Sequence, residues 1–263
     1  MKLDKINLTD FQKRKFKDFY VCVYVLTKEI KIRTDASITD KELYMLFGID
    51  IMGNRQILGF FFDNKFDNRF WLEKFEDFKA RNLENILFFV TPQHKNIERC
   101  IKIIYNDVAI IHSPEDTCFS INKFFADHPS RKMQIALKKL FLIENKELFE
   151  QELSLFKEMY VNNKLIMLLL QKRESEINEF YQYDYELRKL FFPYYTMHEA
   201  KKFLNKLNTQ DKLCTNITEI ISFCLPLVNS FEVGRNYSKQ EWLTLVSSLY
   251  ETHSKKLEEY ING

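Results

Sequence analysis

Glycine and proline are scarce in this sequence, and each occurs five times in 263 residues. Long structureless linkers are therefore not expected, because flexible linkers are rich in glycine and stiff ones in proline. The five cysteines include no CxxC pair and are scattered through apolar stretches, at Cys22, Cys100, Cys118, Cys214 and Cys224. An odd count in such contexts predicts reduced, buried thiols in a cytosolic protein.

Segments that would direct the chain to a membrane or out of the cell are not found. The N-terminal sequence, MKLDKINLTDFQKRK, lacks the apolar run of a signal peptide. The most apolar helix candidate, residues 165–170, is far too short to span a bilayer. We therefore expect a cytoplasmic protein that does not contact a membrane.

Motifs for cofactors and metals are missing as well. No P-loop, GxGxxG, nucleophile elbow or HExxH occurs. His112 with Cys118, or with nearby His128, lacks the spacing of zinc ligands, so we interpret these residues as structural. The sequence therefore gives no reason to expect a cofactor or a metal.

An excess of one charge is also lacking, because 39 basic and 37 acidic residues leave a net charge of +2. A dedicated nucleic-acid binder usually carries a strong basic excess or a basic stripe. The nearest features are an N-terminal cluster and a later one beside Arg188 and Lys189. Their members are Lys13, Arg14, Lys15 and Lys17 in the first, and Lys201, Lys202 and Lys206 in the second. Both are interpreted as solvated surface, with phosphate contact as the alternative.

Aromatic residues, in contrast, are abundant. They form 15% of the chain and include 25 phenylalanines, so large rings must fill much of the core. The first part of the chain has the pattern of strands in hairpin order. Strands are predicted at residues 19–33, 43–47 and 56–62, with turns at residues 34–40 and 50–54.

Helices and buried strands alternate in the next part. Apolar residues at helical spacing predict a helix between an N-cap at Asn68 and a stop at Asn82. A strand at residues 86–90, a helix at 97–105 and a short strand at 108–111 follow. This order of elements alone predicts a mixed α/β sheet.

From Ser130 onward the pattern is helical. Helices are predicted at residues 130–141, 146–160, 164–181, 197–207, 216–225 and 238–260. Ser238 and Glu241 form a capping-box signature for the last of them. The apolar stripe of Leu153, Phe156, Met159 and Tyr160 is interpreted as core rather than as a groove for a partner.

One block of the sequence, residues 42–87, carries a specific resemblance. It contains LFGID at 46–50, GNRQILG at 53–59, FWL at 70–72 and LENIL at 83–87. In order and spacing these segments resemble the framework G-I-D, G-x-K-E-V-L-G, F-W, G-V-x-D-I-L of the mutator-type family of bacterial insertion-sequence transposases. Residues 183–194, with Trp242 and Leu245, resemble the later part, so the likeness covers residues 19–251.

The resemblance implies an α/β fold with an RNase H-like mixed sheet, built of three antiparallel strands and then helix, strand, helix and strand. It divides the chain into a basic N-terminal segment at residues 1–18 and the α/β core at 19–128. An all-helical insertion would follow at 129–192, and C-terminal helices completing the core at 193–263.

The family holds two metal ions with an aspartate, aspartate, glutamate triad, and the matching positions here carry other residues. In the stretch LTKEIKIR, at residues 26–33, the first aspartate is replaced by Leu26. In VTP, at 90–92, the second is replaced by Thr91. Ungapped extension from residues 186–189 puts His198 at the glutamate. Since Mg²⁺ requires charged oxygen ligands, the resemblance implies that the metal cradle has been lost.

Neighbouring residues do not offer an evident replacement for this triad. Lys28 is predicted to face the same side as Leu26, which places a cation where the metal would lie. Glu29 and Glu199 are turned away by strand and helix periodicity. The roles of hydroxyl nucleophile, base and orienting group can be assigned to Thr91, His198 and Glu199. We interpret these residues instead as polar remnants of a decayed cleft.

The sequence is therefore identified as a catalytically inactive, repurposed relative of these transposases. We expect it to bind nucleic acid or a nucleic-acid-handling complex and to regulate or block it. The candidate contacts are Lys28, Lys31, Lys201, Lys202 and Lys206. The alternative is a protein-interaction module or inhibitor, carried by a mobile element or phage, that does not bind nucleic acid directly. A continuous positive groove favours the first function, and an apolar patch elsewhere favours the second.

Overall fold

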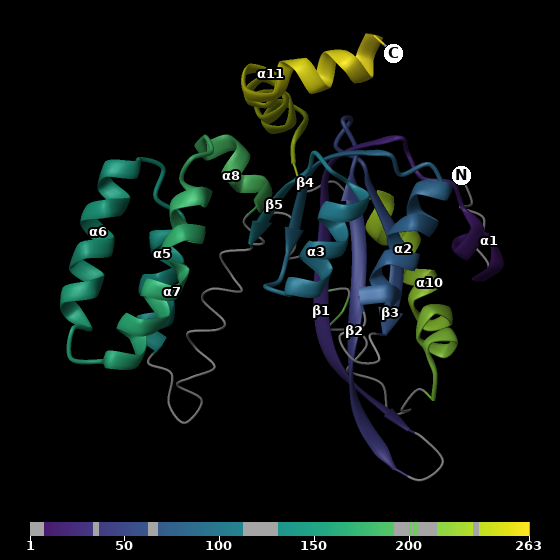
Figure 1. Ribbon diagram of the computed structural model, residues 1–263, viewed down its shortest axis with the longest axis horizontal. Coiled ribbons are helices and arrows are strands. Elements are labelled where there is room, and N and C mark those ends of the chain that lie inside the picture. Colours follow the sequence, from purple (N-terminus) through teal and green to yellow (C-terminus); the bar gives the residue numbers. More distant parts are fainter. Residues whose placement is uncertain are drawn as a thin grey trace.

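A five-stranded mixed sheet forms the centre of the protein, here described from a computed structural model (Figure 1). The structure describes residues 8–33, 37–62, 68–112, 131–191, 200, 202, 204, 215–233 and 237–262. The strand order is β3-β2-β1-β4-β5. The strands are β1 (Phe19–Arg33), β2 (Ile38–Ile49), β3 (Arg55–Phe62), β4 (Asn85–Thr91) and β5 (Ala109–His112).

The directions of the strands follow from their connections. The first three strands follow one another along the chain, and β1 pairs with β2 and β2 with β3 in antiparallel fashion. The helices α2 (Asn68–Ala80) and α3 (Lys95–Ile104) lead into β4 and β5, which run parallel to β1. The predicted RNase H-like α/β core, with three antiparallel strands followed by helix, strand, helix and strand, is confirmed.

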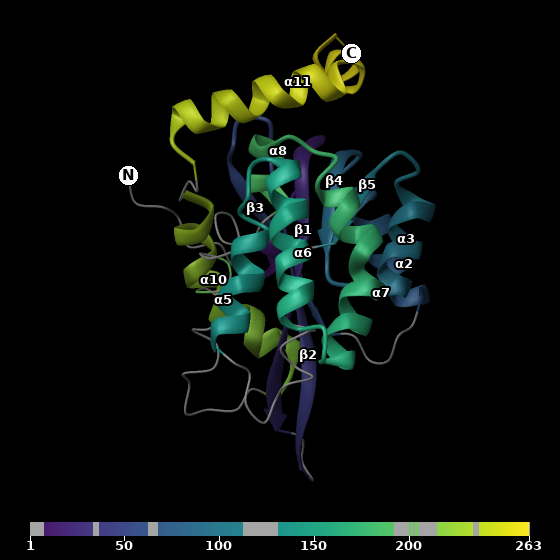
Figure 2. The same ribbon diagram turned by 90° about the vertical axis from the view of Figure 1, so that its left-hand side faces the viewer.

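Each face of the sheet is covered by a separate apolar cluster. Helices α2 and α3 cover one face, where Trp71, Phe75 and Phe78 pack against Tyr20, Phe89 and other aromatic residues. The second cluster lies on the other face and includes residues of the later helices. These are α5 (Arg131–Leu140), α6 (Lys146–Met159), α7 (Lys164–Phe180), α8 (Tyr185–Phe191), α10 (Ile217–Val233) and α11 (Lys239–Asn262). Figure 2 shows α5, α6 and α7 side by side on one side of the sheet.

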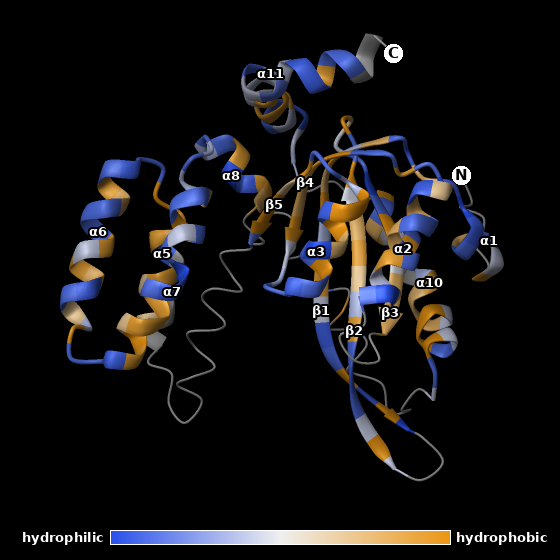
Figure 3. Cartoon of the chain, viewed as in Figure 1, coloured by the Kyte–Doolittle hydropathy of each residue, from blue (hydrophilic) through white to orange (hydrophobic). Residues whose placement is uncertain are grey.

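Strands β1 and β2 continue beyond the rest of the sheet as a two-stranded arm. Beyond the last residues of β2 that pair with β3, Leu43 and Tyr44, the arm pairs residues 29–33 with 38–42, ending at Arg33 opposite Ile38. In Figure 3, β1 changes from hydrophobic to hydrophilic where it enters the arm. The prediction that residues 34–40 form a turn is wrong for 38–40, because cross-strand pairing to the long β1 extends β2 through these polar residues.

The turn between β2 and β3 lies within the block, residues 42–87, that carries the sequence resemblance. The Asp50 carboxylate accepts hydrogen bonds from the amides of Met52 and Asn54 at 2.9 Å. Gly53 has φ +76°, and a Cβ there would lie 2.9 Å from Cδ2 of Trp242. Trp242 Nε1 in turn donates to the carbonyl of Ile51 at 2.9 Å. Helix α11 therefore packs on this turn through Trp242. The contact brings together two parts of the resemblance that are distant in sequence.

Local signals in the helices are largely reproduced. Asn82 has φ 81° and follows α2, where the Leu83 amide donates to the Phe78 carbonyl, as expected of a helix stop. Ser238 and Glu241 form the predicted capping box, with bonds of 2.8 and 3.2 Å. Cys22, Cys100 and Cys224 are buried and form no disulfide, as predicted, while Cys118 and Cys214 lie outside the described residues.

Two predictions about the helices need correction. Helix α10 continues through Pro226 to Val233, beyond the predicted end at residue 225. In α6, Phe156 is buried as predicted, but Met159 is 69% exposed and does not belong to the core. Among the described residues, the structure contains no helix that is long and apolar enough to cross a membrane.

The N-terminal segment is fastened to the edge strand β3. Helix α1 (Leu8–Lys13) contacts α10, and the Arg14 guanidinium binds both carboxylate oxygens of Glu232, at 2.8 and 3.2 Å. Arg14 also donates to the Ile57 carbonyl, and the Ile57 amide donates to Glu232 at 2.7 Å. Both interpretations of the N-terminal basic cluster are therefore wrong for Arg14, which is committed to an internal ion pair. The predicted domain boundary at 18/19 stays a prediction, and those at 128/129 and 192/193 lie outside the described residues.

Candidate functional site

The two residues that the resemblance assigns to the first two triad positions, Leu26 and Thr91, lie on neighbouring parallel strands. Tyr24 in β1 is paired with Val90 in β4, and Leu26 and Thr91 follow them toward the carboxyl ends of the two strands. Both side chains are buried, Leu26 at 6% and Thr91 at 1% exposure. His198, the third position, lies outside the described residues. The structure thus places both predicted positions at one edge of the sheet, the edge formed by the carboxyl ends of the parallel strands.

The side chains of these two positions do not converge. Leu26 belongs to the cluster on the face of the later helices, together with Val90. Thr91 follows Val90, so strand alternation turns it to the opposite face, toward α2 and α3. Its hydroxyl is buried without a hydrogen-bond partner among the described residues. Leucine and threonine on opposite faces offer no carboxylate oxygen to a metal ion.

A cluster of charged and polar side chains, which no sequence pattern predicted, lies at the same edge. His112, at the end of β5, is paired in register with Thr91. Its Nε2 lies 3.1 Å from Oε1 of Glu98 in α3, and its Nδ1 lies 4.0 Å from Oε1 of Glu176 in α7. Arg173 lies 3.2 Å from Glu176, and Gln93 donates to the same carboxylate. We call these five residues the edge cluster; it joins α7 to the sheet.

Ionisation within the edge cluster follows from its geometry. Burial alone would lower the pKa of His112, but the hydrogen bond and charge of Glu98, with the charges of Glu176 and Glu179, raise that pKa above its ordinary value. The hydrogen bond from His112 in turn lowers the pKa of Glu98. The imidazolium is thus held between carboxylates from two elements.

Replacing His112 with asparagine should remove a pH-dependent part of the stability, on the order of 1 kcal/mol. Because the pKa is raised in the folded state, the stabilisation is complete below the unfolded pKa of about 6.5 and is lost as pH rises through the folded pKa. Urea unfolding of the wild type and H112N should differ most at acidic pH and converge at alkaline pH. Glu98→Gln should abolish the same pH dependence, and a difference that stays constant with pH would contradict this account.

The edge cluster does not have the composition of a metal centre. Throughout the described ranges, no group of three or more His, Cys, Asp or Glu side chains is placed so that it could hold a metal ion. The carboxylates of Glu98 and Glu176 are engaged by His112 and Arg173. The edge cluster can hold a proton on His112 and attach α7 to the sheet.

The predicted phosphate contacts are only partly described. Lys28 lies on β1 between Leu26 and Ile30, on the same face, and burial lowers its pKa. Lys31 is exposed and, by alternation, belongs to the opposite face, where it pairs in register with Asp40. Lys202 is exposed, whereas Lys201 and Lys206 lie outside the described residues. Lys28 and Lys31 therefore do not share one surface of the strand.

The basic residues that accompany the second lysine cluster are engaged inside the protein. Arg188 is 5% exposed and donates to the carbonyls of Ile143, at 2.9 Å, and Glu144. Lys189 Nζ lies 2.6 Å from the carboxylate of Glu186. Arg188 thus holds the connection between α5 and α6 and is not solvated surface, whereas Lys202, the described member of the neighbouring cluster, is exposed.

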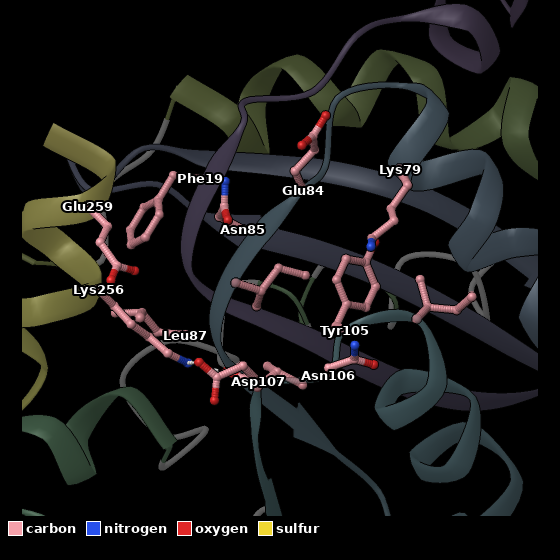
Figure 4. A pocket seen from close by; sticks show the side chains of 13 residues that line it. Phe19, Lys79, Glu84, Asn85, Leu87, Tyr105, Asn106, Asp107, Lys256 and Glu259 are labelled. Carbon is pink, nitrogen blue, oxygen red and sulfur yellow. Dashed lines mark hydrogen bonds and ion pairs between the residues drawn. The ribbon is translucent and has the colours of Figure 1, made fainter. Parts of the chain in front are cut away.

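A cavity of about 330 Å³ lies at the opposite edge of the sheet, where the parallel strands begin (Figure 4). It is lined by Phe19 and Asn85, the first residues of β1 and β4, and by Tyr105. Lys256 of α11 reaches Asp107 at 2.8 Å beside it. Of the predicted site residues that the structure describes, Leu26, Lys28, Lys31, Thr91 and Lys202, none lines this cavity. It is thus separate from the edge at which Leu26 and Thr91 lie.

Comparison with protein families gives one finding. The family described as "Transposase, Mutator family" matches residues 2–205, more than three quarters of the chain. The chain therefore belongs to the Mutator family of transposases, as the resemblance implied. Comparison with curated proteins gives no match.

Proposed function

We propose that this member of the Mutator family does not cut DNA and instead binds nucleic acid, or a complex that handles nucleic acid, and regulates or blocks it. What supports the proposal is the resemblance, which puts Leu26 and Thr91 at two of the family's metal-binding positions, together with the burial of both side chains. Two-metal phosphoryl transfer depends on carboxylates that hold the ions between them. A leucine within the apolar core supplies no such ligand.

The surroundings of these positions support the same proposal. The nearest described carboxylates of the edge cluster, Glu98 and Glu176, are held by His112 and Arg173. A relocated metal site would have to break these contacts. Family membership supports nucleic acid as the partner, and Lys28 and Lys202 are described cations that could contact phosphate.

A second function, a protein-interaction module without direct nucleic-acid binding, is favoured by the charges of the arm. On its exposed side Lys31 lies opposite Asp40, and Glu29 lies opposite Glu42. Acidic residues therefore accompany the cations there, and such a surface does not attract a polyanion strongly. The net charge of +2 agrees with this alternative.

The proposal predicts salt-dependent binding without cleavage. Fluorescence anisotropy with single- and double-stranded DNA and RNA, at low and physiological salt and with Mg²⁺, should show binding that weakens as salt rises. The probes should remain intact on a gel, as they should in a parallel reaction with a chelator. The slope of the logarithm of the binding constant against the logarithm of the salt concentration should fall in magnitude by about one for each phosphate-contacting lysine replaced by glutamine.

Matched variants make this experiment decisive. K28Q and K202Q should weaken binding uniformly across sequences, whereas K172Q, at an exposed position of α7, should leave it unchanged. Cleaved probes that require Mg²⁺ would overturn the inactivity proposal. An absence of binding even at low salt would instead support the protein-interaction function, to be pursued by pull-down from the native host.

A further inference from the structure

Helices α5 and α6 form an apolar groove on the side of α6 that the core does not cover. The groove encloses about 320 Å³, and its lining includes the buried Leu140 and Phe156. Three further lining residues are strongly exposed: Leu148 at 47%, Leu155 at 52% and Met159 at 69%. Figure 1 shows α6 as the described helix farthest from the sheet, so the groove lies at the periphery. A contiguous exposed apolar surface of this kind marks an interaction site.

The spacing of the exposed residues is that of a helix–helix interface. Leu148, Glu152, Leu155 and Met159 follow one another at intervals of four, three and four residues. This alternation places them in a single stripe along the helix, as in coiled-coil seams. The neighbouring stripe of Phe149, Leu153, Phe156 and Tyr160 packs against the core. Helix α6 thus carries two apolar stripes about 100° apart, one used inside the chain and one exposed.

The charges beside the groove are complementary to each other. Helix α5 contains four basic and no acidic residues, and its exposed Lys139 lines the groove. Helix α6 contains four glutamates and two lysines, and Glu152 lies within the exposed stripe. An occupant must therefore present an apolar stripe, an acidic side toward α5 and a basic side toward α6. A second copy of the same pair of helices meets all three requirements.

We propose that the groove is the contact surface of a symmetric homodimer. The α6 helix of each copy lies antiparallel in the groove of the other, so that Leu148 faces Met159 of the second copy across a two-fold axis. Glu152 of each copy then comes within reach of Lys139 of the other. A two-fold contact uses the same patch on both chains, so the patch must be complementary to itself. The opposite charges of α5 and α6 meet this requirement, because α5 of one copy faces α6 of the other. The dimer is independent of the proposed nucleic-acid binding.

Light scattering coupled to size-exclusion chromatography, over a concentration series of the full chain, tests this proposal. The wild type should have twice the mass of one chain. Leu155→Glu should raise the dimer dissociation constant by about a hundredfold or more, because the change acts on both sides of the axis. Leu243→Glu, at a residue of α11 that is 57% exposed and outside the groove, is the control and should remain dimeric. Unchanged thermal unfolding of the monomeric species would show that L155E is folded.

Charge exchange gives a second, independent measurement. Lys139→Glu and Glu152→Lys should each weaken the dimer, and the double variant should recover it, because the ion pair is restored with its charges reversed. A monomeric wild type at every concentration would overturn the proposal and leave the groove to a helix of another protein. A dimer that persists in L155E would overturn it as well, by placing the contact elsewhere.

Discussion

Replacing Leu26 with aspartate should destabilise the protein by about 3–5 kcal/mol at neutral pH. The position is 6% exposed and lies within an apolar cluster, so a carboxylate there would be removed from water. Burial raises the pKa of such a group, so that it protonates more readily in the folded than in the unfolded chain. The destabilisation should therefore be small at acidic pH and grow as pH rises, which urea unfolding at several pH values would measure.

Leu26→Asn is the matched control, because it introduces a polar group of the same shape without the charge. Both variants lose the same apolar contacts, so only the gap between L26D and L26N should depend on pH. Lys28 lies on the same face two residues along, and it is the cation that would partly offset the charge. L26D combined with K28M should therefore be less stable than L26D alone. If L26D matched L26N at neutral pH, position 26 would be solvated, which would contradict its place within the apolar cluster.

Elements whose signals are local could be predicted from the sequence. The strand signal in residues 19–33, the stop at Asn82 and the Ser238–Glu241 capping box each depend on neighbours within a few positions. Their geometry therefore follows from backbone preferences and short-range hydrogen bonds. The adjacency of Leu26 and Thr91 followed from the family fold, because carboxyl ends of neighbouring parallel strands meet at one edge.

Features that depend on distant partners could not be predicted. The sequence predicts a structural role for His112, but nothing in it pairs this residue with Glu98 or Glu176. The extension of β2 into residues 38–40 is imposed by β1, which overrides the turn-like composition. Met159 was assigned to the core stripe of α6, but three residues after Phe156 the helix has turned it toward the exposed stripe.

Replacing Arg14 with methionine should cost about 2–4 kcal/mol of stability, the second large effect that we expect. The Arg14 and Glu232 side chains are 15% and 19% exposed, so removal of the guanidinium leaves a largely buried carboxylate without its counter-charge. The carbonyl of Ile57 also loses its donor. Burial already raises the pKa of Glu232, and the charge of Arg14 is the chief opposing influence. The loss in R14M should therefore shrink as pH falls and Glu232 becomes protonated.

A double-mutant cycle with Glu232→Gln separates the pair from its surroundings. The neutral glutamine can still accept the hydrogen bond from the Ile57 amide, so R14M/E232Q should be more stable than the sum of the single effects predicts. Strictly additive losses would show that the two side chains do not stabilise each other. The pair also occupies the outer hydrogen-bonding groups of β3, which is an edge strand of the sheet. Because an uncovered edge is a template for further strands, R14M, which exposes the carbonyl of Ile57, should aggregate faster than the wild type, and light scattering during storage would detect this difference.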